Sequence, residues 1–153
     1  LKFRPNEGNY YESPIATTSA YPLMRVEEMY FIEAEAAERV AAGTGIALLE
    51  NFMKTYRDKN YTYTGTDAID EIIFQKRIEL WGEGQSFFDI KRANLSVTRG
   101  YQDTNFFEDW RFNTNGRPAW MNFCIVSLEE NDNPAVKGKN NPDPSRAYPL
   151  WKE

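Results

Sequence analysis

Histidine is absent from the 153-residue sequence, and cysteine occurs once, as Cys124. Without histidine, neither a Ser-His-Asp triad nor a Cys-His pair can be built, and the commonest transition-metal ligand is missing. A single cysteine permits no internal disulfide and no paired-thiol metal site. We interpret Cys124, which stands between Phe123 and Ile125, as a small buried apolar residue. Carboxylates are the catalytic groups that these absences leave open.

Long apolar stretches are also missing: no run approaches the roughly 20 residues that a membrane-spanning helix needs, and no signal peptide is present. The formal net charge is −5, from 18 basic and 23 acidic residues. A nucleic-acid surface needs a basic stripe, so we expect no nucleic-acid partner.

We interpret residues 1–153 as a single domain. Because the chain starts at Leu1 within a polar stretch, we expect it to be a fragment of a longer protein.

Hydrophobic periodicity predicts two helices over residues 23–42 and 46–58, with Gly43 and Gly45 ending the first. So short a connection predicts an antiparallel hairpin, close in length to one tetratricopeptide-like unit of about 34 residues. Small residues on the apolar face of the first helix should let its neighbour approach closely. The predicted apolar faces comprise Val26, Tyr30, Ala34, Ala37 and Ala41 in the first helix and Leu49, Phe52 and Tyr56 in the second.

A third helix is predicted over residues 67–81, with Thr66 as its N-cap, and a short fourth helix over 86–93. The third helix is apolar on most sides, so we expect other helices to cover it. A charged cluster flanks the turn between them: Arg77, Glu79, Glu83, Asp89 and Arg92. We interpret this cluster as an ion-pair network that pins the two helices together, and not as a glycosidase-type carboxylate pair.

The rest of the chain predicts little regular structure. Residues 1–22 form an irregular lead-in whose Pro22 could open the first helix, and residues 94–153 are mostly irregular. Asn-Gly at 115–116 could form a tight hairpin turn. Glu129, Glu130, Asp132 and Asn133 do not fit an EF-hand, so a solvated acidic loop is favoured over a calcium site. The sequence predicts a mainly α fold: a helical region over 23–93 and a long, irregular, aromatic-rich C-terminal segment.

Three stretches, in order along the chain, carry a recognisable combination of residues. They are LMRVEEMYFIEAEAA at 23–37, RIELWGEGQSFFDIKR at 77–92 and IVSLEENDNPAV at 125–136. Together they resemble the C-terminal region of SusD/RagB-type lipoproteins. The matching residues are Arg25, Glu28, Tyr30, Ala34, Glu35 and Ala36; then Arg77, Glu79, Leu80, Glu83, Gly84, Phe88, Asp89 and Arg92; then Ile125, Glu129, Asn133 and Pro134. The sequence departs from the family at Gln85 and Ser86, where His-Arg is usual, and at Val126, where proline is usual.

The resemblance implies a mostly helical, tetratricopeptide-like protein at the outer face of an outer membrane. A lipidated cysteine, absent from this fragment, would be its only link to the membrane. The family works with a SusC-like, TonB-dependent transporter and captures oligosaccharides or other nutrients for it. We therefore expect a nutrient-binding subunit that is not an enzyme and uses no cofactor.

The aromatic segment is the predicted ligand site. Flat aromatic rings can stack on the CH faces of sugars while neighbouring polar groups bind hydroxyls. Tyr101, Trp110 and Trp120 are the candidate binding residues, although most tryptophans in proteins are largely buried. The alternative is a helical protein-protein interaction module without a small-molecule ligand. Burial of both tryptophans would favour that alternative, whereas one ring exposed beside polar groups would favour ligand binding.

Overall fold

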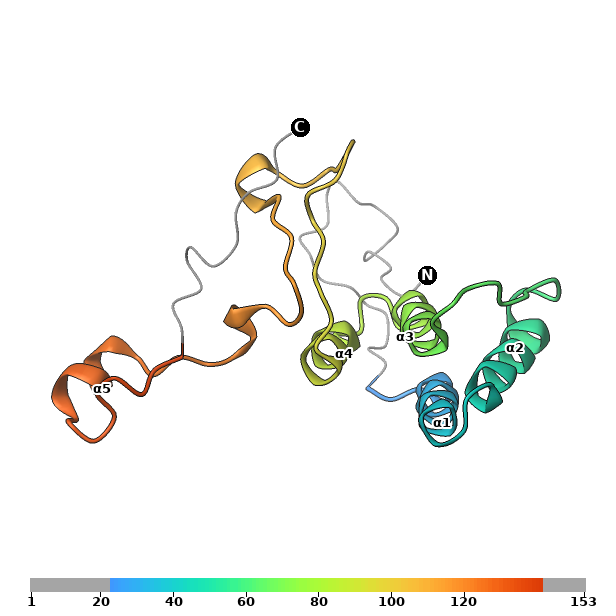
Figure 1. Cartoon of the computed structure of the whole chain (residues 1–153), viewed down its shortest axis with the longest axis horizontal. Helices are drawn as coiled ribbons and strands as arrows, with labels where there is room; N and C mark the ends of the chain where they lie inside the picture. The colour runs from blue at the N-terminus through green and yellow to red at the C-terminus, as the bar shows by residue number, and fades with distance from the viewer. Residues whose placement is uncertain (1–22, 142–153) are drawn as a thin grey trace, which may run out of the picture. The chain divides into compact units, whose positions relative to one another are not determined.

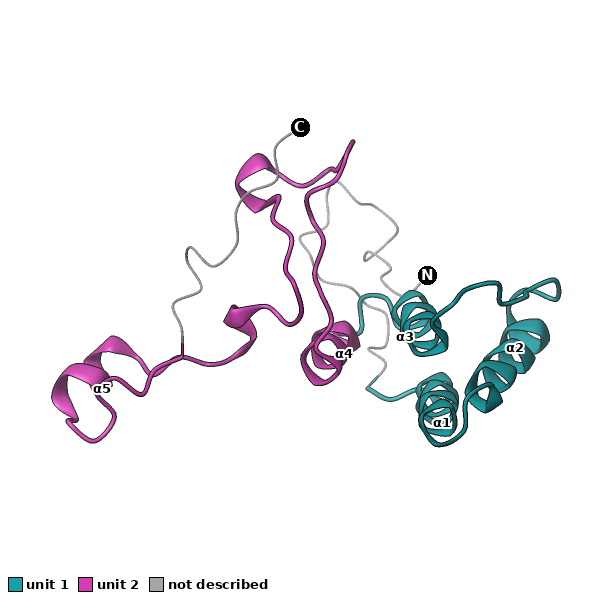
Figure 2. Cartoon of the chain, in the orientation of Figure 1, with its two compact units in different colours: residues 1–83 teal, residues 84–153 magenta. Residues whose placement is uncertain are grey.

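The computed structural model describes residues 23–141, and the chain divides into two compact units, residues 1–83 and 84–153 (Figure 2). Unit 1 contains helices α1 (Val26–Val40), α2 (Thr44–Tyr56) and α3 (Ala68–Glu79) (Figure 1). The described part of unit 2 contains α4 (Gln85–Ala93), the 3-10 helices η2 (Glu108–Trp110) and η3 (Ala119–Met121), and α5 (Ser127–Asp132). The predicted mainly α fold class is confirmed.

Regular β structure in residues 23–141 is limited to one isolated bridge, between Thr98 and Asn113. None of the helices in this part of the chain combines the length and the apolar character needed to cross a membrane. The expected irregular lead-in, with Pro22, lies outside the described residues. The tetratricopeptide-like character of the hairpin stays a prediction.

Helices α1 and α2 form the predicted antiparallel hairpin. Phe31 near the start of α1 contacts Phe52 near the end of α2, whereas Glu38 near the end of α1 reaches the first turn of α2. The Glu38 carboxylate accepts hydrogen bonds from the backbone N–H groups of Gly43, Gly45 and Ile46, at 2.8, 3.0 and 3.0 Å. These bonds satisfy N–H groups that have no partner within α2 and lower the pKa of Glu38.

Gly45 allows the close approach of the two helices. A Cβ atom at this position would lie 2.0 Å from the carbonyl oxygen of Ala34 and 2.6 Å from Glu38 Cβ. The expectation that Gly45 ends the first helix is wrong, because Gly45 lies buried within the first turn of α2. Gly43, with φ of 88°, is the residue that makes the turn between the helices.

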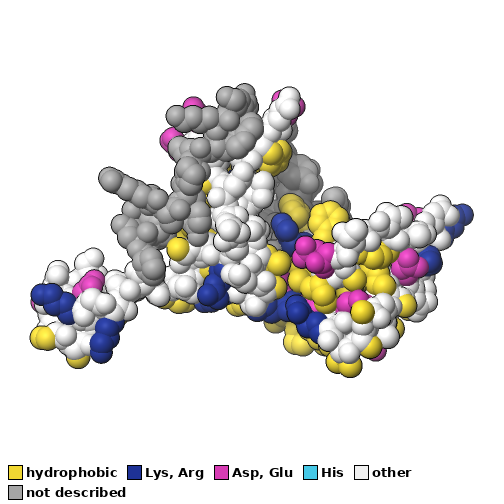
Figure 3. All heavy atoms as spheres, viewed as in Figure 1, with side chains coloured by type: hydrophobic (Ala, Val, Ile, Leu, Met, Phe, Trp, Pro, Cys, Tyr) yellow, Lys and Arg dark blue, Asp and Glu magenta, His cyan; other side chains and the backbone are white. Residues whose placement is uncertain are grey.

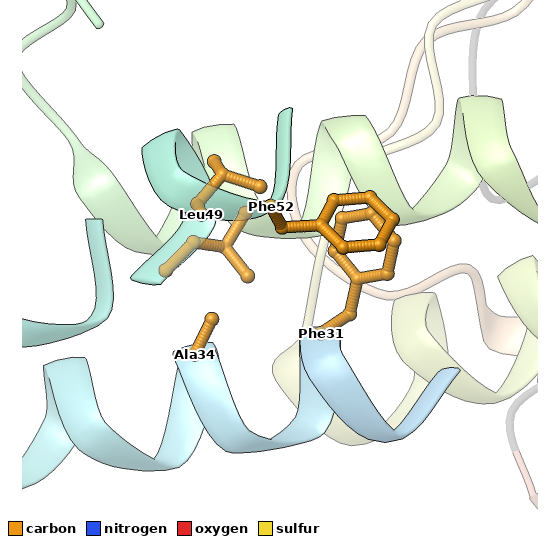
Figure 4. Packing of buried hydrophobic residues seen from close by; sticks show 5 residues of the cluster. Phe31, Ala34, Leu49 and Phe52 are labelled. Atoms are coloured by element: carbon orange, nitrogen blue, oxygen red, sulfur yellow. The ribbon is translucent and has the colours of Figure 1, made fainter. Parts of the chain in front are cut away.

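The core of unit 1 includes only part of the predicted face of α1. Phe31 and Ala34 are buried and pack with Leu49 and Phe52 of α2 and with Ile72 of α3 (Figure 4). The rings of Phe31 and Phe52 meet edge to face, with centroids 5.2 Å apart. This geometry confirms the core positions Leu49 and Phe52 predicted for α2, but Tyr56, the third predicted position, is 55% exposed. In α1 the prediction of Ala34 is confirmed, and Phe31, which was not predicted, is buried beside it. Val26 and Ala41 are exposed at the two ends of α1, and Tyr30 lies at the edge of the core.

Helix α3 begins one residue later than predicted. Asp67 is its N-cap, and the Asp67 carboxylate accepts a hydrogen bond of 2.9 Å from the backbone N–H of Asp70. The predicted N-cap, Thr66, is therefore wrong. Asp outcompetes Thr here because an ionised carboxylate is the stronger acceptor and also complements the helix dipole.

One side of α3 is open to solvent, contrary to the expectation that other helices cover most of it. Ile72 and Ile73 are buried, but Phe74, Ile78 and Trp81 are 51%, 55% and 68% exposed. Phe74 and Ile78 are four residues apart and share one face of α3, and Trp81 lies just beyond the end of the helix. The space-filling view shows hydrophobic side chains gathered with charged ones on the surface of unit 1 (Figure 3).

Candidate functional site

Two acidic residues of the predicted charged cluster, Glu79 and Glu83, have partners in unit 1 that the sequence did not indicate. Arg25, the N-cap of α1, donates from Nη1 to Glu83 Oε1 at 2.8 Å and pairs through Nη2 with Glu79. Arg57, the C-cap of α2, donates from Nε to Glu79 Oε2 at 2.6 Å and from Nη2 to Glu79 Oε1 at 2.9 Å. Glu79 therefore ties the end of α3 to both other helices of the unit.

These contacts set the protonation state of Glu79. The hydrogen bonds from Arg57, supported by Arg25, lower the pKa of the carboxyl from 4.5 to about 2 against the opposing effect of burial. A group with so low a pKa is a poor proton donor or acceptor near neutral pH. The geometry therefore favours a structural role for Glu79 over a glycosidase-type acid or base.

The remaining members of the charged cluster give no sign of a catalytic pair. Asp89 and Arg92 form an ion pair within α4, with Arg92 Nη2 2.7 Å from Asp89 Oδ1. The Arg77 side chain is exposed. In the described part of the chain, no group of three or more acidic, histidine or cysteine side chains could hold a metal ion.

The aromatic segment of unit 2 is organised by a short antiparallel contact. Thr98 and Asn113 form the bridge, and the Arg99 N–H donates to the Phe112 carbonyl at 3.1 Å. The Asn113 side chain reinforces this contact, because its Oδ1 accepts from the Arg99 and Gly100 N–H groups and its Nδ2 donates to the Gly100 carbonyl. These contacts fix the two ends of the loop that connects Gly100 to Phe112.

Two further hydrogen bonds shape this loop from inside. The hydroxyl of buried Thr104 donates to the Arg99 carbonyl at 2.9 Å, and Arg111 Nε donates to the Phe106 carbonyl at 2.9 Å. The predicted hairpin turn at Asn115–Gly116 is wrong, because these residues come after the bridge between Thr98 and Asn113 and not between its two sides. Gly116 does adopt a turn conformation with φ of 82°, and its N–H is bound by the Ser96 hydroxyl.

Arg99 gathers three rings around its guanidinium group. The Arg99 Cζ lies 4.8 Å from the ring centroid of Phe112, 5.2 Å from that of Phe106 and 5.9 Å from that of Trp110. Phe112 in turn meets Trp120 edge to face, with centroids 4.9 Å apart. We call these five residues the Arg99 cluster. Cation–π contacts of this kind contribute about 0.5–1 kcal/mol each, so together they hold the rings in one arrangement.

The cluster brings together two of the three predicted binding residues. Trp110 is 58% exposed and Trp120 is 37% exposed, so neither ring is sealed in a core. Tyr101 is also exposed, but no ring contact joins it to the cluster among the described residues. Arg99, Phe106 and Phe112 complete the group. Arg99 was not predicted as a site residue, although its position as a basic residue within the aromatic-rich segment could have indicated it.

Two other predictions near the C-terminus are changed by the structure. Cys124 is exposed, so the expectation of a small buried residue is wrong, and its neighbour Phe123 is exposed as well. Glu129 and Glu130 belong to the short helix α5 and not to an irregular loop. Both bind amide groups: Glu129 accepts from the Asn133 side chain at 2.7 Å, and Glu130 from Asn140 at 3.2 Å.

A mainly helical fold with a half-exposed aromatic platform defines the chain as a candidate binding protein. The model of the SusD family matches residues 1–133. The chain belongs to the SusD family. Members of this family are nutrient- or glycan-binding lipoproteins associated with the outer membrane, and they are binding proteins rather than enzymes. No curated protein and no solved structure matches the chain.

Proposed function

We propose that the protein binds a glycan at the Arg99 cluster and delivers it to a SusC-like, TonB-dependent transporter of the outer membrane. Binding is reversible and breaks no bond. Trp110 supplies the main stacking surface, and Trp120 supplies a second aromatic surface beside it. Tyr101 is a peripheral contact from the same loop.

The observation that carries this proposal is the exposure of an ordered aromatic surface. An isolated tryptophan that is 58% exposed has lost little contact with water and is free to change rotamer. Trp110 differs, because Arg99 contacts its ring and holds it near Phe106 and Phe112. A sugar that stacks on a ring already held in place loses less side-chain entropy on binding. Polar groups beside the rings, such as Arg111, can bind hydroxyls.

Delivery to a transporter and attachment to the outer membrane rest on family membership alone. The SusD family generally works with SusC-like transporters and binds glycans. In this account the platform captures the oligosaccharide, and the transporter receives it in a later step.

Quenching of tryptophan fluorescence by acrylamide tests the binding step. The quenching constant of the whole chain is measured alone and with each member of a panel of oligosaccharides. Because Trp81 is also exposed, the measurement is repeated in the variants Trp81→Phe and Trp110→Phe. We expect one sugar to reduce quenching in the wild type and in Trp81→Phe, and to have little effect in Trp110→Phe.

Two results would contradict this proposal. Protection that persists in Trp110→Phe but disappears in Trp81→Phe would place the sugar elsewhere. No protection by any sugar, in a chain that melts cooperatively, would mean that the Arg99 cluster is not a sugar platform.

The second candidate function is a helical interaction module without a small-molecule ligand. The exposed face of α3, formed by Phe74 and Ile78, favours it together with the exposed Trp81 just beyond the helix, because exposed apolar side chains that are grouped often mark a protein contact. The exposure of Trp110 and Trp120 favours ligand binding over this alternative. The two functions separate in the same experiment, since a pure interaction module shows no sugar protection.

A further inference from the structure

Within residues 23–141, the Arg99 guanidinium has aromatic neighbours but no acidic partner. Among the described residues no ion pair or side-chain hydrogen bond involves this group, whose contacts are with the rings of Phe106, Trp110 and Phe112. Three arginines of unit 1 differ, because Arg25, Arg39 and Arg57 each pair with a glutamate. Ring faces attract the positive charge but accept N–H groups only weakly. Arg99 therefore keeps most of its five N–H donors for another acceptor.

The acidic residues of the same loop could have supplied that acceptor, but they do not. Asp103, Glu108 and Asp109 lie within ten positions of Arg99, and none of them forms an ion pair with it. Arg99 is also partly buried, so its charge is less hydrated than that of a fully exposed arginine. A partly desolvated guanidinium without a carboxylate partner is an energetically favourable place for an incoming oxyanion.

From this arrangement we propose that the glycan bound at the Arg99 cluster is acidic, and that a carboxylate or sulfate group on one of its sugars binds the Arg99 guanidinium. This inference rests on the proposed function and adds the chemical class of the ligand. The planar fork of arginine matches the two oxygens of either group. Trp110 stacks on the same or the adjacent sugar, because its ring already lies beside Arg99 at 5.9 Å.

The test compares acidic and neutral ligands of equal length on the whole wild-type chain. The carboxylate pair is trigalacturonate and its fully methyl-esterified form, which differ only in charge and the ester methyl groups. The sulfate pair is galactotriose and its sulfate ester. Calorimetric titration at low salt should show that at least one acid binds about tenfold or more tightly than its neutral counterpart, as one charge-assisted pair predicts. Raising the ionic strength should reduce this preference.

Variants then connect the preference to Arg99. Arg99→Gln should abolish it, and Arg99→Lys, which keeps the charge but loses the planar fork, should reduce it. Lys137→Gln is the matched control: Lys137 is an exposed residue of unit 2, and the substitution removes the same charge. This variant should keep the full preference. Because the wild-type comparison needs no substitution, a variant that fails to fold leaves the test intact.

Each outcome separates the two proposals. If the carboxylate or the sulfate pair shows the preference and Arg99→Gln removes it, the inference holds, and the responsive pair identifies the anion. If the neutral ligands bind as tightly as the acids, the inference is overturned while the glycan platform stands. If none of the four ligands binds, and no other glycan of the panel does, both proposals fail.

Discussion

Replacing Glu79 with glutamine tests the ion-pair network of unit 1. The substitution keeps the size of the side chain but removes the charge that Arg25 and Arg57 share. Glu79 is only 14% exposed, whereas Arg57 is 35% exposed. The pKa of the Glu79 carboxyl is about 2 in the folded protein, compared with an ordinary value of 4.5. A difference of this size corresponds to about 3 kcal/mol of folding free energy at neutral pH. Solvent screening around Arg57 lowers our expectation to about 2 kcal/mol.

The sign of the pH dependence follows from the lowered pKa. The stabilisation is fully present above the unfolded value of 4.5 and is lost as the pH falls toward the folded value of about 2. Glu79→Gln should therefore be about 2 kcal/mol less stable than the wild type at pH 7. The difference should shrink steadily below pH 4.5, because protonated Glu79 and glutamine are both uncharged.

Urea unfolding followed by circular dichroism, at several pH values between 7 and 3, measures this difference. Glu33→Gln is the matched control, because it removes the same charge from an exposed position of α1. We expect the control to change the free energy of unfolding by less than about 0.5 kcal/mol. The stabilising role of the ion-pair network would be refuted if Glu79→Gln changed the free energy of unfolding no more than the control does. A change that stays constant down to pH 3 would refute it as well.

Two further substitutions test the packing and capping of unit 1. Gly45→Ala should lower the free energy of unfolding in urea by about 3 kcal/mol, because the added Cβ meets the Ala34 carbonyl oxygen. Gly43→Ala is the comparison: its Cβ meets no atom within 4 Å, so only the strain of the positive φ remains, which should cost about 1 kcal/mol. Equal costs would contradict the close approach. Asp67→Ala should cost about 1 kcal/mol in thermal unfolding, while Thr66→Ala should cost a few tenths at most. The reverse order would restore Thr66 as the N-cap.

The helices of unit 1 were predictable because their apolar residues recur at helical spacing. Leu49 and Phe52 are buried as that spacing indicates. The buried face of α1 was predicted only in part, because Ala34 belongs to the predicted stripe whereas Phe31 lies beside it, and only tertiary packing chooses between neighbouring stripes. Glu35 is buried as well, and its ion pair with Arg39 lets a charged residue occupy the inner side.

Long-range contacts were beyond the reach of periodicity. Arg57 lies 22 positions from Glu79, and nothing in local spacing joins them. The candidate site likewise combines residues that the sequence identifies with a contact that only the folded chain creates. Trp110 and Trp120 could be named from their chemistry, whereas the role of Arg99 depends on the loop fold that brings Phe112 and Phe106 to its side chain.

Calorimetric titration of an oligosaccharide that binds the wild type into Trp110→Ala measures whether Trp110 is part of a glycan platform. Phe107→Ala is the control, since Phe107 is an aromatic residue of the same loop that is 84% exposed. Loss of one stacked ring should cost about 1 kcal/mol or more of binding free energy, a fall in affinity of about fivefold or greater. We expect this fall for Trp110→Ala and unchanged affinity for Phe107→Ala. Unchanged affinity in Trp110→Ala would contradict the role of Trp110 in the platform.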